Sequence, residues 1–182
     1  MCKKNISKEV KWLLLGIPVI FIASAIFHFV YGWTGNNKVV GMFFPANESI
    51  FEHLKMLIFP IIIWWTAIYF AKGKELNIDK NKWFFGCLVS LVASMLFMMM
   101  FYYTITGALG IESLALDIAN TFLSIAFGQL LGIHFYKHSK GIEWNGSWAI
   151  IIVIVAVCIW FSLNPPELPM FLDATTGTYG IK

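Results

Sequence analysis

Residues 45–71 read PANESIFEHLKMLIFPIIIWWTAIYFA, and this stretch decides the fold. Its second part is apolar for about 18 residues or more, which is long enough to cross a bilayer as a helix. Its first part gathers two glutamates, a histidine and a lysine at the point where the apolar run begins. The stretch therefore predicts a membrane helix that starts in a strongly polar segment.

The composition of the whole chain supports a membrane setting. Of 182 residues, 59% are hydrophobic and 13% are charged, and the mean hydropathy is +0.74. A water-soluble domain of this size cannot bury so much apolar surface, so lipid must complete the core. All 13 basic residues are lysine, and without arginine the chain lacks the planar, bidentate phosphate ligand. We expect the lipid bilayer as a partner and no nucleic acid.

Five segments of the chain have the length and apolarity of bilayer spans. They predict an all-α, polytopic transmembrane helix bundle that forms one domain, residues 1–182. Pro165 and Pro166 end the last apolar run, and the polar tail after it is expected either to be disordered or to cover the outer face. The predicted spans are residues 11–32, 50–71, 83–105, 113–136 and 147–163, followed by an outer tail at 164–182.

The lysines predict the orientation of these spans. Ten of the 13 lie before or at the edge of the first span, between the second and third, or after the fourth, whereas the opposite loops and tail hold Lys38 and Lys182. Short lysine-rich loops stay in the cytoplasm. We therefore expect a cytoplasmic N-terminus and an extracytoplasmic C-terminus.

With this orientation, the unusual polar residues gather on the outer side. A carboxylate at membrane depth costs about 2.5 kcal/mol or more, so it is normally paired, hydrated or functional. The sequence predicts an outer pocket that binds a cation or a small polar solute. The candidate pocket residues are His28, Glu48, Glu52, His53, Asp117 and Asn120.

Ordinary structural roles compete with a functional role for several of these residues. Ser49 and Glu52 have the spacing of a capping box at a helix start, and Lys55 has the spacing to pair with Glu52. A single histidine such as His28 is more often a hydrogen-bonded core residue than a ligand. Glu48 and His53 have no such explanation, so the structural roles leave them as candidates.

Asp117 is the strongest single candidate on the sequence alone. It shares a helical stripe with Gly128 and Gly132, whose GxxxG spacing is typical of close helix packing, either inside the bundle or between protomers. A packed stripe carries Asp117 away from lipid. The same stripe is the predicted contact for a homo-oligomer or a partner membrane subunit.

The candidate ligands fit a metal ion by type. Imidazole and carboxylate ligands together suit zinc or another divalent metal, and His28, Glu48, His53 and Asp117 are the candidate set. His134 and His138 form an HxxxH pair, but His134 follows Asp117 by 17 residues. That separation is about 25 Å along a helix, near the opposite face of the bilayer.

The segments FHFVYGWTGNNKVVGMFFPANESIFEHLKMLIFP (27–60) and PPELPMFLDATTGTYGI (165–181) carry a family resemblance. On them the chain resembles a family of small bacterial integral-membrane proteins of unknown function. The resemblance covers nearly the whole chain and implies a multi-pass protein of the bacterial cytoplasmic membrane. It implies no activity.

Three functions remain open on the sequence. The first is binding or transport of a cation or small polar solute in the outer pocket. The second is a metal-dependent hydrolase or transferase that acts on lipid or envelope substrates, with a metal-bound water as nucleophile and a glutamate or Asp117 as general base. The third is a structural or accessory membrane subunit.

Overall fold

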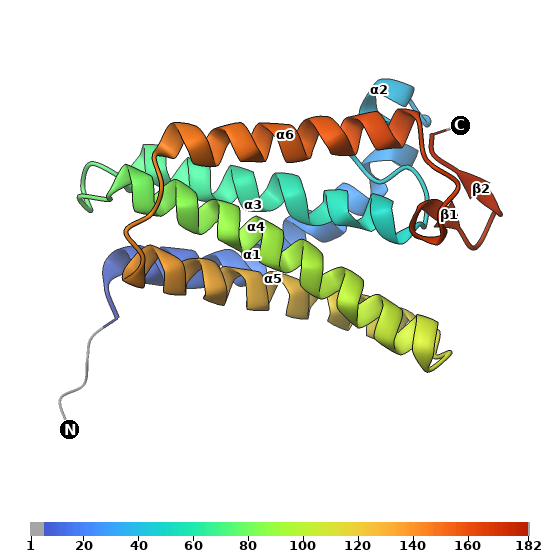
Figure 1. The fold of residues 1–182 in the computed structure, drawn as a ribbon, viewed down its shortest axis with the longest axis horizontal. Helices are drawn as coiled ribbons and strands as arrows, with labels where there is room; N and C mark the ends of the chain where they lie inside the picture. The colour runs from blue at the N-terminus through green and yellow to red at the C-terminus, as the bar shows by residue number, and fades with distance from the viewer. Residues whose placement is uncertain (1–5, 182) are drawn as a thin grey trace.

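The computed structural model describes residues 6–181, and most of this length is helical (Figure 1). The polar segment between the first two long helices contains one short helix, and the chain ends in a small hairpin. The helices are α1 (Lys8–Trp33), α2 (Lys38–Gly41), α3 (Ile50–Lys72), α4 (Lys80–Tyr102), α5 (Leu114–His138) and α6 (Trp144–Leu163). The remaining elements are a π-helical turn η1 (Tyr103–Ala108), a 3-10 turn η2 (Pro169–Phe171), and the strands β1 (Leu172–Asp173) and β2 (Thr178–Tyr179).

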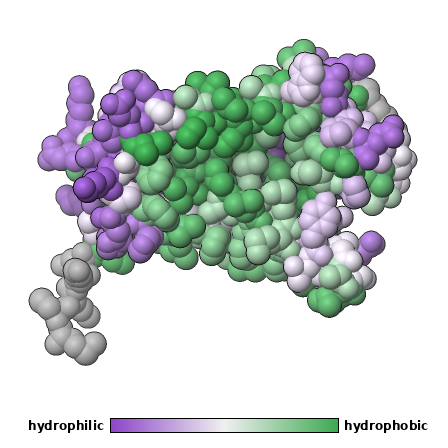
Figure 2. Space-filling view, in the orientation of Figure 1, coloured by the Kyte–Doolittle hydropathy of each residue, from purple (hydrophilic) through white to green (hydrophobic). Residues whose placement is uncertain are grey.

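Five of these helices, α1, α3, α4, α5 and α6, are long and apolar enough to cross a membrane. Each overlaps one segment that hydropathy predicts as a span. Figure 2 shows an apolar band around the middle of the molecule, between two more polar ends. The chain is therefore an all-helical protein of the multi-pass membrane type.

The long helices are arranged around α3 and α4, which are the most buried of the five. In Figure 1, α6 runs along one side of this central pair, and α1 and α5 lie along the other side. The α3–α4 and α5–α6 loops share one end of the bundle with the start of α1. This end carries the lysines of those loops; Lys3, Lys4 and Lys182 lie outside the described residues.

The C-terminal tail is folded against the opposite end of the bundle. Phe171 is buried, and its ring lies 4.5 Å from that of Phe51, measured between centroids. Strands β1 and β2 pair antiparallel after it. Burial raises the pKa of Asp173, but hydrogen bonds from Thr175 and Thr176 outweigh it and hold the pKa below its usual value. The sequence left two expectations for the tail, disorder or an ordered cover over one end of the bundle. The structure has the ordered cover.

The glycines of α5 pack inside the chain. A Cβ atom placed on Gly132 lies 2.6 Å from the carbonyl oxygen of Gly86, and one placed on Gly128 lies 2.5 Å from that of Ser90. Both partners belong to α4, the helix against which α5 packs most extensively. The Gly128/Gly132 face is thus occupied within one copy, which leaves it closed to the oligomer or subunit contact that the spacing alone allows.

The close α4–α5 approach gives a first test. We expect Gly132→Ala to lower the free energy of unfolding by about 1–3 kcal/mol, because the added methyl group meets backbone atoms of α4. Gly146→Ala is the matched control, since the nearest atom to its Cβ is 3.7 Å away. Thermal unfolding in detergent, followed by tryptophan fluorescence, measures both. Equal melting temperatures for the two variants would contradict this packing.

Candidate functional site

Three predicted residues converge at the end of the bundle opposite the lysine-bearing loops. The carboxylate of Glu48 lies between two imidazoles, with Oε1 3.6 Å from His28 Nε2 and Oε2 3.5 Å from His53 Nε2. Their ligand atoms all lie within 4.8 Å of one another. In residues 6–181 this is the one group of three or more histidine, cysteine or carboxylate ligands with such spacing. We call it the His28–Glu48–His53 cluster.

The spacing within the cluster suits a metal ion better than direct hydrogen bonds. Separations of 3.5 and 3.6 Å are too long for good hydrogen bonds between nitrogen and oxygen. Two ligand atoms bound to one tetrahedral zinc, with bonds of about 2.0–2.2 Å, lie about 3.3–3.6 Å apart. Side-chain adjustments that draw the ligand atoms closer than 4.8 Å would let the three groups share one ion.

The backbone of α3 prepares His53 for such a role. Its Nδ1 lies 2.9 Å from the carbonyl oxygen of Ser49, one turn earlier. When Nδ1 donates its proton to this carbonyl, Nε2 is left with a free lone pair that faces Glu48. On the other imidazole, His28 Nδ1 is buried and has no hydrogen-bond partner among the described residues.

A proline in α3 helps to set the height of His28. Pro60 has no N–H, so the carbonyl of Met56, four residues earlier, lacks its helical donor. The Ser24 hydroxyl of α1 donates to this carbonyl at 2.7 Å in a buried position. Ser24 precedes His28 by one helical turn, and Met56 follows His53 by nearly one turn. The hydrogen bond therefore holds α1 and α3 in the register that brings the two histidines together.

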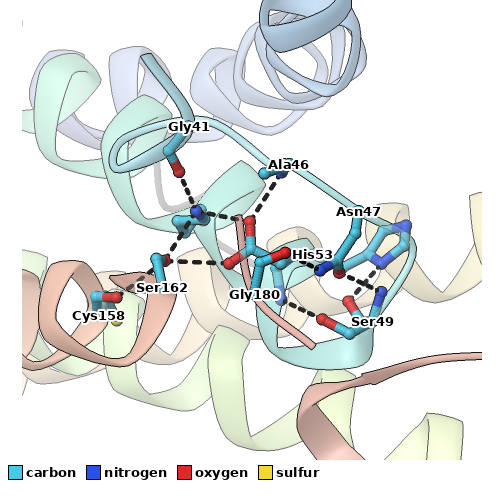
Figure 3. A network of polar contacts seen from close by, with 10 residues as sticks. Gly41, Ala46, Asn47, Ser49, His53, Cys158, Ser162 and Gly180 are labelled. Carbon is cyan, nitrogen blue, oxygen red and sulfur yellow. Dashed lines mark hydrogen bonds and ion pairs between the residues drawn. The ribbon is translucent and has the colours of Figure 1, made fainter. Parts of the chain in front are cut away.

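Glu48 is held by the loop before α3. Ser49 is the N-cap of this helix and has an extended backbone, so Glu48 lies outside the helix. Asn47 Oδ1 accepts a hydrogen bond from the Ser49 amide at 2.9 Å, and Asn47 Nδ2 donates to the carbonyl of Gly180 in the tail at 3.0 Å (Figure 3). These contacts fix the loop on both sides of Glu48.

Next to the cluster, Glu52 and Lys55 form a fully buried ion pair. Lys55 Nζ lies 2.6 Å from Glu52 Oε2, and it also donates to the carbonyl of Gly41 at 2.6 Å and to Ser162 Oγ at 2.9 Å. Glu52 in turn accepts from the Ala46 amide at 2.7 Å and from Ser162 Oγ at 3.0 Å. Figure 3 shows how this network joins the loop, α3 and α6. All three donors of the lysine are used.

The other predicted pocket residues lie outside the cluster. Glu52 belongs to the ion pair, and Asn120 is buried, where it donates to the carbonyl of Met98 at 3.2 Å and so joins α5 to α4. Asp117 is exposed in the first turn of α5. The expectation that the glycine stripe carries it into the bundle fails, because burial of the stripe begins only at Asn120, about one turn further along α5. His134 and His138 are exposed near the lysine-bearing end.

Sequence reasoning missed Ser162, the partner that ties α6 to the ion pair. Its side chain is fully buried. The available signal was a hydroxyl near the end of an otherwise apolar span, since polar groups in such spans usually have a partner in the protein. The partner itself is 107 residues away along the chain, beyond any local pattern.

The ion pair gives a second test. We expect Lys55→Met to lower the free energy of unfolding by about 3–5 kcal/mol, because it leaves the Glu52 charge buried without compensation. The double variant Glu52→Gln/Lys55→Met should recover part of this loss. The matched control is Lys72→Met, which breaks the exposed pair of Lys72 with Glu75 and should change the unfolding free energy far less, because water screens this pair. Thermal unfolding in detergent compares them, and a Lys55→Met protein as stable as Lys72→Met would refute the buried pair.

The Ser24 hydroxyl gives a third test. Ser24→Ala leaves the Met56 carbonyl buried without a donor, and we expect a loss of about 1–3 kcal/mol in unfolding free energy. Ser147→Ala is the control, because Ser147 Oγ is equally buried and has no hydrogen-bond partner among the described residues. Hydrogen exchange of the α1 and α3 amides provides a local measurement. Similar exchange in the two variants would show that the hydroxyl does not hold the register.

Comparison with known proteins bears on the whole chain. No curated protein and no solved structure matches it. One family model, described as a family of unknown function, matches residues 1–181. The chain therefore belongs to the family of unknown function DUF6512.

Proposed function

We propose that this protein binds a divalent metal cation through His28, Glu48 and His53 at the outer edge of the membrane. The observation that carries the proposal is the convergence of the three ligand atoms within 4.8 Å. They come from α1, from α3 and from the loop between them, so folding has to bring them together. The ordered contacts around Glu48 and His53 are those expected of a metal site with supporting hydrogen bonds.

Zinc is the best match among common divalent metals. Two imidazoles and one carboxylate are a frequent zinc ligand set, whereas calcium and magnesium prefer oxygen ligands alone. Three protein ligands leave a fourth position for water or for a ligand oxygen. The side chains of the cluster are partly exposed, at 25% for His28, 49% for Glu48 and 23% for His53. That exposure lets an ion enter from solution.

The lysine distribution supports an extracytoplasmic position for the site. The cluster lies at the end of the bundle away from the lysine-bearing loops, and such loops remain in the cytoplasm. The family resemblance supports the bacterial cytoplasmic membrane as the location. We infer that the cation comes from the outer compartment.

We propose that a single copy of the protein binds the cation but does not transport it. Beneath the cluster, the side chains of Leu57, Ile58 and Ile61 are fully buried and apolar. A conducting path needs polar groups or water along its length. Transport by this protein would therefore require a further subunit.

A metal-dependent hydrolase or transferase is the second candidate function. The open fourth position favours it, because three-ligand zinc sites are typical of catalysis. A water at that position becomes a nucleophile near neutral pH. Asp117, in the first turn of α5, is the candidate general base that the sequence offers.

Elemental analysis of the purified protein tests the proposed metal site. We expect close to one zinc per chain after dialysis against a zinc-containing buffer, and a loss of most of it in His28→Ala, His53→Ala and Glu48→Ala. Removing one of three ligands takes away a large share of the binding free energy, so affinity should fall by about 100-fold or more. Competition with a chromophoric chelator measures this change.

Two variants serve as controls for this experiment. His134→Ala removes a histidine whose ring lies 4.7 Å from that of His138, between centroids, at the other end of the bundle. Asp117→Ala removes a nearby carboxylate that lies outside the cluster. Both should keep the zinc. A metal-free protein, or zinc lost only with His134→Ala, would refute the site.

A further inference from the structure

A groove opens beside the cluster and leads away from it along α1. Its volume is about 290 Å³, and His28 and Glu48 form part of its wall. The rest of the wall includes Phe29 and Trp33 of α1 and the Pro45–Asn47 loop. The groove therefore joins two metal ligands to an aromatic surface.

The aromatic wall is the outer end of a continuous apolar stripe. Residues spaced three or four apart share one face of a helix. On α1 this face is exposed along its whole length, and in a bilayer such a face is covered by acyl chains. The stripe consists of Leu15, Val19, Ile22, Ile26, Phe29 and Trp33, which are 37% to 69% exposed.

The upper end of the stripe lies where lipid headgroups begin. Phe29 and Trp33 stack with ring centroids 5.9 Å apart and an interplanar angle of 24°. Tryptophan at a helix end is typical of the membrane–water interface. A lipid whose chains follow the stripe therefore has its headgroup at the groove.

The charge of the groove determines which chemical group of a lipid headgroup it binds. Glu48 is the acidic residue in the wall, and no lysine is present among the described residues that line it. Without a metal, this carboxylate repels a phosphate. With a divalent cation in the cluster, the local charge becomes positive and the open coordination position accepts an oxyanion.

We propose that the groove binds the phosphate group of a membrane lipid, whose oxygen completes the coordination of the bound cation. This inference rests on the proposed metal site. The size of the groove agrees with it, because about 290 Å³ lies at the low end of small-ligand pockets and holds a headgroup while leaving the chains outside. Phe29 and Trp33 position the lipid, and His28 and Glu48 position the ion.

Native mass spectrometry of the full chain in detergent tests the proposal with phosphatidylglycerol as the probe. We expect the zinc-loaded protein to retain this lipid and the chelator-treated protein to lose it. In the variant Phe29→Ala/Trp33→Ala, lipid affinity should fall about tenfold, because two aromatic contacts with the lipid are removed. The zinc content of this variant should be unchanged.

Trp160→Ala is the matched control. Trp160 is 63% exposed, close to the 69% of Trp33, but it lies on α6. Its removal should leave lipid retention unchanged. Equal retention by the wild-type protein and by Phe29→Ala/Trp33→Ala, or retention without zinc, would overturn the inference.

Inorganic phosphate separates the lipid from a free anion. If inorganic phosphate displaces the bound lipid as effectively as free lipid does at the same concentration, the site takes free phosphate and the lipid proposal is wrong. We expect weak displacement, since phosphate gains nothing from the apolar stripe. A wild-type protein without zinc would overturn the proposed function itself, whereas zinc binding with no zinc-dependent lipid would overturn this inference alone.

Discussion

The buried ion pair of Glu52 and Lys55 is the interaction on which the end of the bundle that carries the cluster depends. Through it, α3 is joined to the carbonyl that ends α2, to the loop before α3, and to Ser162 of α6. An ion pair away from water is stable only when its remaining donors and acceptors are used, and here they are. The positions of α2, of the loop before α3 and of α6 are therefore set by the hydrogen bonds that the Glu52 and Lys55 charges require.

The cluster and the ion pair come from the same short stretch but serve separate purposes. Glu48 precedes the helix, whereas Glu52 lies in its first turn, so the two carboxylates point to different partners. Glu52 turns inward to a lysine and a serine, and Glu48 reaches the histidines. Glu52 stabilises the loop, whereas its neighbour His53 offers a nitrogen to the proposed metal site. Rigid support of this kind is what a metal site needs from its surroundings.

Much of the fold could be predicted, because a bilayer span requires a long apolar run and little else. Of the four candidate metal ligands, His28, Glu48 and His53 lie together in the structure. Asp117 does not join them, because its stripe packs only farther along α5. Glu48 lies outside the helix, since α3 starts at Ile50. A single extended residue at the N-cap decides this, and periodicity cannot detect it.

The hydrogen bond from Ser24 to Met56 has a consequence for the evolution of the family. The acceptor is free only because Pro60 cannot donate to it, so the hydroxyl and the proline form one functional unit although they lie on different helices. In a homologue with an amide-bearing residue at position 60, the carbonyl is used within its own helix, and the side chain at position 24 is released to become apolar. The two positions should therefore change together in related sequences, and a sequence with only one of them should place α1 differently.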